Sequence, residues 1–213
     1  KPVMVSLHML GAFAVQGFLI GGILRHRNFN NPTPIESKKI KGLKLLIILC
    51  FLCLLVQIGL GIQIRESVDW VIKTSEQVDR TNLIQLVPWI FYVHRSFSWV
   101  IFSLALIILY KIYKNTNPTD CYKSKNRLFF VKFSKALRVN SLFKYSFLFF
   151  ILVCSQMFIG GALNHLDFPI FAQPVHLLAA NLLFGLLCFV WGSYDVKTIY
   201  KSPKSLDQQM AIS

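Results

Sequence analysis

Three histidines enter apolar stretches of this chain at similar places. His8 lies in "KPVMVSLHML", His94 in "VPWIFYVHRSF" and His176 in "QPVHLLAANLL", and each follows a proline by six or seven residues. An ionisable ring is costly in hydrocarbon, so such a residue inside a membrane segment indicates function. Neutral imidazole is a good ligand for heme iron. Three rings at matching depth therefore favour a heme site over histidines that only hydrogen-bond to a neighbour.

The pair expected to share one heme is His94 and His176. Two imidazoles on facing helices give a low-spin b-type center. Arg95 and Arg65 are candidates to hold the propionates, and an ordinary interfacial charge is equally compatible with each. Close helix approach around the macrocycle would be allowed by Gly59, Gly61, Gly160, Gly161 and Gly185.

Other chemistry finds less support. No CxxCH is present, which excludes covalent heme attachment. A copper or zinc site is disfavoured, because no carboxylate or cysteine accompanies the distant histidines. His26 in "RHR" is expected on a solvated basic face, and His165 in "GALNHLDF" at the interface. His8 is a candidate ligand of a further heme site, and no unused histidine of equal depth remains in this chain to pair with it.

The elements that must position these residues are membrane helices. The chain has 213 residues, of which 54% are hydrophobic and 15% charged, too few charges to cover a soluble domain of this length. Spanning backbone must satisfy its own hydrogen bonds, so an all-α integral membrane protein is predicted. Five apolar runs are long enough for a bilayer core of roughly 30 Å, near 3–24, 44–64, 89–110, 145–163 and 174–194.

The net charge of +14 is explained by topology rather than by nucleic-acid binding. Six Lys or Arg lie in 25–44 and nine in 111–144, against three in 65–87 and none in 164–173. The positive-inside rule makes the basic segments cytoplasmic. Residue 1 is then outside and the C-terminus inside, as in a multi-pass protein of a bacterial-type inner (plasma) membrane.

The spans repeat. "VQIGLGI" at 56–62 and "SQMFIGG" at 155–161 each place a glutamine four residues before a glycine, and an outer loop, a proline and a histidine follow. The spans from 44 to 194 thus resemble two copies of one hairpin, which predicts an antiparallel four-helix bundle. The first span resembles half of a third copy, so we expect further helices before Lys1.

The loops and cysteines add less. The polar outer loop 65–87 is expected to be partly helical. The inner loop 111–144 contains "KSKNRLFFVKFSKALRV", typical of an amphipathic stretch on the membrane surface, with a flexible basic loop as the alternative. Cys50 and Cys53 form a CxxC inside an apolar span, where packing is favoured over metal or redox chemistry. None of the cysteines lies in an outer loop, so no exported disulfide is predicted.

The chain resembles the heme A synthase family. The resemblance rests on "PWIFYVHRSFSWVIF", "QMFIGGAL", "FPIFAQPVHLLAANLLFG" and "KPVMVSLHMLGAFAV", and it covers nearly all of 1–213. It implies eight helices in two pseudo-symmetric halves and oxidation of a heme O methyl group to the formyl group of heme A. It also implies that His94 and His176 ligate heme b, and that His8 matches a histidine of the substrate half.

The resemblance implies a domain plan as well. Residues 1–24 would be the last helix of the N-terminal half, 25–43 a cytoplasmic linker, 44–194 the heme-binding half and 195–213 a cytoplasmic tail. The catalytic glutamate and a second histidine are expected upstream of Lys1. Members of the family often have a cysteine pair in the outer loop of each half, but loop 65–87 has none, so a redox role of that pair is not carried over.

The leading interpretation is therefore a membrane oxidoreductase of heme A synthesis with heme b as cofactor and heme O as substrate. Its partners would be the lipid bilayer, an unspecified electron donor, and heme O synthase or terminal oxidase assembly factors. The alternatives are a non-enzymatic b-type cytochrome subunit and a transporter whose histidines carry protons.

Overall fold

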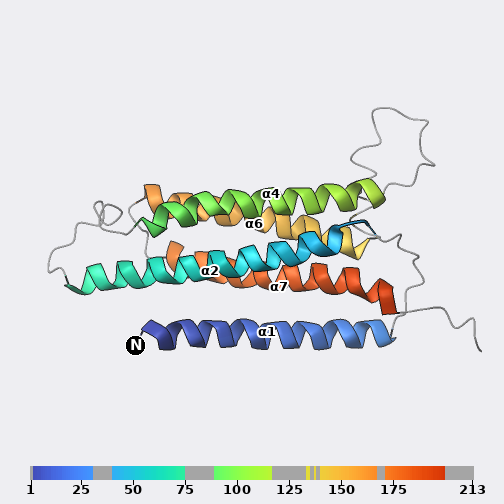
Figure 1. Cartoon of the computed structure of the whole chain (residues 1–213), viewed down its shortest axis with the longest axis horizontal. Helices are drawn as coiled ribbons and strands as arrows, with labels where there is room; N and C mark the ends of the chain where they lie inside the picture. Colours follow the sequence, from blue (N-terminus) through green and yellow to red (C-terminus); the bar gives the residue numbers. More distant parts are fainter. Residues whose placement is uncertain are drawn as a thin grey trace, which may run out of the picture.

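The computed structural model describes residues 2–30, 40–74, 89–116, 133–134, 137, 140–166 and 171–199, and nearly all of these residues lie in helices. This confirms the all-α membrane fold. The helices, shown in Figure 1, are α1 (Pro2–Asn30), α2 (Leu43–Thr74), α4 (Ile90–Thr116), α6 (Ser141–His165) and α7 (Ala172–Ile199).

Four of these helices form an antiparallel bundle. α2 contacts α4, α4 contacts α6, α6 contacts α7, and α7 returns to α2, which closes the ring. α1 lies outside the ring and packs mainly on α7 (Figure 1). α1, α4 and α7 begin at the end of the molecule where α2 and α6 finish. We call it the histidine end, because His8, His94 and His176 lie in the first two turns of their helices.

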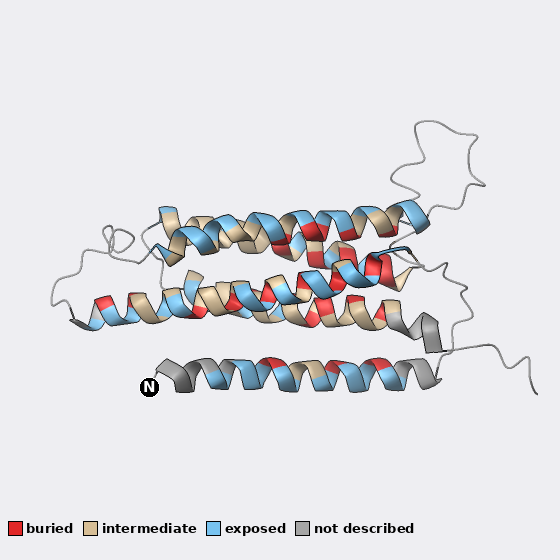
Figure 2. Ribbon diagram, in the orientation of Figure 1, coloured by how far each residue is buried: buried red, intermediate tan, exposed pale blue. Residues whose placement is uncertain are grey.

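The four bundle helices are each long and apolar enough to cross a membrane. In α1 the described apolar stretch, Leu10–His26, is shorter, so the first span at 3–24 stays a prediction. α2 continues ten residues beyond the expected span, to Thr74, and so includes the first part of loop 65–87. That loop is partly helical, as expected. Exposed residues lie along every helix (Figure 2). Many of them are large and apolar, as on a surface covered by lipid.

The fully buried side chains gather away from the histidine end. Phe143 and Leu187 belong to this packed half, in which Phe143 also meets the rings of Tyr113 and Phe133 at 5.9 and 5.5 Å between centroids. α6 begins here, with the Asn140 side chain accepting a hydrogen bond from the backbone N–H of Phe143. The bundle is therefore tightly packed in this half, whereas its cavity lies in the half with the histidines.

Several predictions concern residues outside the described part. Most of the amphipathic stretch in 111–144, the later part of loop 65–87, Cys121 and the tail beyond 199 belong there. Among the described cysteines, Cys50, Cys53, Cys154 and Cys188 are all free.

Candidate functional site

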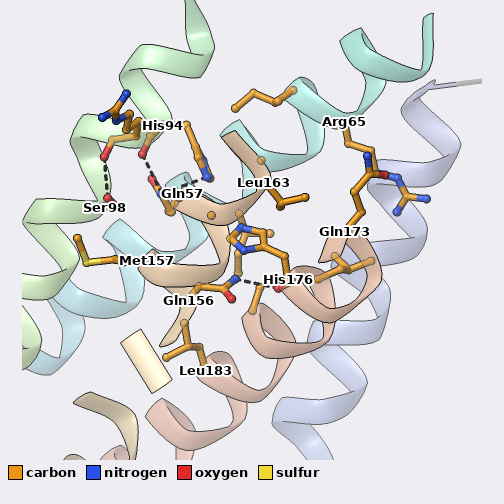
Figure 3. A pocket seen from close by; sticks show the side chains of 18 of the residues that line it. Gln57, Arg65, His94, Ser98, Gln156, Met157, Leu163, Gln173, His176 and Leu183 are labelled. Carbon is orange, nitrogen blue, oxygen red and sulfur yellow. Dashed lines mark hydrogen bonds between the residues drawn. The ribbon is translucent and has the colours of Figure 1, made fainter. Parts of the chain in front are cut away.

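A cavity of about 560 Å³ lies inside the bundle at the histidine end. All four bundle helices line it, mostly with apolar side chains, and α1 adds Phe13. His94 on α4 and His176 on α7 both line this cavity, and Figure 3 shows their side chains within it. The structure therefore brings together the two histidines that the sequence paired.

On the α2–α4 side, a glutamine and a glycine of α2 hold His94. The Gln57 amide nitrogen donates to the backbone carbonyl of His94 at 3.0 Å and lies 3.4 Å from the ring nitrogen Nε2 (Figure 3). A Cβ atom added at Gly61 would lie 3.3 Å from Cε1 of the same ring. The imidazole thus rests against bare backbone, and any side chain at residue 61 would push on it.

The α6–α7 side repeats this arrangement. The Gln156 amide nitrogen donates to the backbone carbonyl of His176 at 2.8 Å (Figure 3). A Cβ atom added at Gly160 would lie 3.3 Å from Cε1 of His176. The same three residue types, at the same spacing within each helix, therefore build both sides of the site.

The repeat extends over the cavity wall. Counted from the glutamine of each copy, equivalent apolar positions line the cavity in both hairpins. These pairs are Leu54 with Val153, Ile58 with Met157, and Ile64 with Leu163. The hairpin repeat seen in the sequence thus has a structural counterpart around one shared cavity.

The rim of the cavity carries the two predicted arginines. Arg65 and Arg95 both line it and both are exposed. Arg65 lies 3.9 Å from Asp69, in a pair whose side chains are about half exposed. Such an exposed pair is weak, so Arg65 is able to exchange this partner for another anion.

The remaining predicted histidines lie elsewhere. His8 is exposed on α1 and does not line the cavity. His26 is exposed near the far end of α1. His165 ends α6, where it is exposed, lines the mouth of the cavity and lies 3.4 Å from the Asn164 amide nitrogen. A place at the mouth agrees with the interfacial position expected for His165.

The site fits a heme. Nδ1 of both His94 and His176 is buried without a hydrogen-bond partner in the structure. Two such rings in an apolar cavity with cations at its rim match the donor set of a bis-histidine heme. Within the described residues, no group of three or more His, Cys, Asp or Glu could hold a bare metal ion.

Two residues of the site were missed as partners of the histidines. The sequence marked Gln57 and Gln156 as repeat positions, but it did not predict that their amides reach the histidine carbonyls. The Gln-x-x-x-Gly spacing indicates only that each glutamine lies on the same helix face as its glycine, because residues four apart share a face. Phe13 was also missed, since nothing in its own segment indicates that α1 reaches the cavity.

Comparison with known proteins supplies the final observation. The family model described as cytochrome oxidase assembly protein (COX15-CtaA) matches residues 1–188. None of the curated proteins or solved structures matches the chain.

Proposed function

Because the chain belongs to the cytochrome oxidase assembly protein family, whose members serve heme A synthesis, we propose that it holds a b-type heme for the oxidation of heme O to heme A. The observation that carries this proposal is the convergence of His94 and His176 in one apolar cavity. When bound, such a heme supplies one-electron redox chemistry.

The residues of the chain divide the work of binding. His94 and His176 would hold the heme iron, and the surrounding apolar wall would keep water from it. Arg65 and Arg95 at the rim pair with the propionate carboxylates, since guanidinium groups match carboxylates in geometry and charge. His8, outside this cavity, contributes to the site of the reacting heme.

The domain plan and the orientation belong to the same proposal. Residues 44–194 form the heme b half, to which 1–24 adds one helix from the substrate half. The histidine end faces the outside of the membrane, because the basic segments 25–44 and 111–144 follow the opposite ends of their helices.

The optical spectrum of the purified protein tests the ligands. We expect a low-spin b-type spectrum that is lost or converted to a five-coordinate form by His94→Ala or His176→Ala. His26→Ala and His165→Ala are the matched controls and should leave it unchanged. Loss of the low-spin spectrum in His165→Ala, with His176→Ala unaffected, would refute the assignment.

The reaction needs a separate test. Membranes of the source organism lacking this gene should accumulate heme O and contain no heme A, and the encoded protein should restore heme A. Heme A at wild-type levels in the deletion strain would rule out the proposed reaction. It would not contradict the proposed heme site, which the optical spectrum tests separately.

A further inference from the structure

Both halves of the site contain the same unexplained feature, a glutamine bound to the backbone of a histidine on the neighbouring helix. Gln57 reaches the carbonyl of His94 at 3.0 Å, and Gln156 reaches that of His176 at 2.8 Å. In each case the amide crosses from one helix of a hairpin to the other. The contact is made at the ligand residue itself.

The hydrogen bonding of the two amide groups themselves does not explain why glutamine stands at these positions. Oε1 of Gln57 and Oε1 of Gln156 are both buried without a hydrogen-bond partner in the structure. A buried polar atom without a partner destabilises the fold, more so in a membrane. An apolar side chain at either position would therefore give a more stable fold. Yet the arrangement occurs twice, in hairpins whose flanking residues differ.

We propose that Gln57 and Gln156 are positioning residues that fix the height and rotation of the two imidazoles in the cavity. The amide holds the backbone of the histidine, while Gly61 or Gly160 leaves room for the ring, because a Cβ atom at either glycine would lie 3.3 Å from Cε1. Together they restrict where the ring can lie. This inference rests on the proposed function. It adds that two side chains that do not bind the iron set the positions of the two histidine rings that would bind it.

The two copies differ in one respect that sharpens the inference. Only for Gln57 does the structure give a second contact, 3.4 Å from its amide nitrogen to Nε2 of His94. With an NH₂ group as the donor, Nε2 acts as the acceptor, and the ring proton of the neutral imidazole is then on Nδ1. Gln57 therefore favours the Nδ1–H tautomer of His94 in the heme-free protein, whereas Gln156 contacts only the backbone of His176.

The test replaces each glutamine with methionine, which has a similar length and no donor. In the oxidised holoprotein, Gln57→Met and Gln156→Met should change the electron paramagnetic resonance g values of the low-spin heme. They should also speed heme transfer to apomyoglobin by about tenfold, the size of effect expected for partners of metal ligands. Gln63→Met is the matched control, because Gln63 is an exposed glutamine of the same helix that does not line the cavity.

A second readout does not depend on heme. In heme-free protein labelled with ¹⁵N-histidine, the imidazole shifts of His94 should report the Nδ1–H tautomer. Gln57→Met should move them toward a tautomer mixture, while Gln156→Met should not. Absence of heme from the wild-type protein would refute the proposed function, and this readout would still decide the role of Gln57.

Other outcomes overturn the inference itself. Unchanged g values and heme release in both variants would show that the amides do not position the rings. Lower thermal stability with unchanged g values and unchanged imidazole shifts would show that the glutamines only join helices, as polar residues do in other membrane bundles.

Discussion

The two hairpins α2–α4 and α6–α7 build the same inner surface and different rims. Inside the cavity, each offers a glutamine, a glycine and a histidine at matching positions. At the rim, Arg65 and Arg95 of the first hairpin correspond to Asn164 and Leu177 of the second. The parts that hold the rings are duplicated, and the positive charge is not. A symmetric pair of histidines is thus combined with one charged side of the rim, which favours a single orientation for a ligand carrying carboxylates.

The largest effect should come from filling the space behind the rings. Gly61→Val and Gly160→Val each place branched carbon atoms where even a Cβ atom lies 3.3 Å from a histidine ring. We expect each variant to lose most of its heme, measured as the heme-to-protein ratio after purification. Gly59→Val is the control, because Gly59, contrary to the close helix approach expected of it, does not line the cavity and has nothing within 4 Å of an added Cβ atom. Heme loss in only one of the two glycine variants would break the equivalence of the hairpins.

A smaller effect should follow from removing the charge of the rim. The double variant Arg65→Gln, Arg95→Gln removes both guanidinium groups, and exposed ion pairs contribute up to about 1 kcal/mol each. We expect heme to dissociate about tenfold faster, with a weaker dependence on salt than in the wild type. The control Asn164→Leu, on the opposite side of the rim, should change the rate little. An equal effect of the control would show that the charge difference between the hairpins has no role.

The smallest effect on heme dissociation is expected at a position where the two hairpins carry different uncharged residues. Ser98, four residues after His94, donates to the backbone carbonyl of Arg95 at 2.6 Å, and Ala180 has the equivalent position in α7. Ser98→Ala makes the two hairpins alike at this point. Because the bond is local to one helix turn, the heme dissociation rate should change by less than about twofold. A change as large as that of the arginine variant would mean that Ser98 itself contacts the ligand.

Much of the fold was predictable, because each membrane helix appears in the sequence as one continuous apolar run. The four bundle helices lie where the apolar runs at 44–64, 89–110, 145–163 and 174–194 placed them. The extension of α2 to Thr74 was less visible, since polar residues such as Glu66 and Asp69 continue a helix without an apolar signal. Helix ends outside hydrocarbon are set by local capping and packing rather than by hydropathy.

The sequence by itself determined which residue types recur and at what spacing. The sequence alone shows a histidine near the start of α4 and of α7. It also shows a glutamine four residues before a glycine in α2 and in α6. The period of the helix then fixes which of these share a face.

Only the tertiary structure decided what those faces meet. It closed the ring of four helices, brought His94 and His176 to one cavity, aimed each glutamine at the histidine backbone, and placed Phe13 of α1 on the cavity wall. The sequence could not give these contacts, because the choice of neighbouring helix and its rotation depend on packing between side chains that are far apart in the chain.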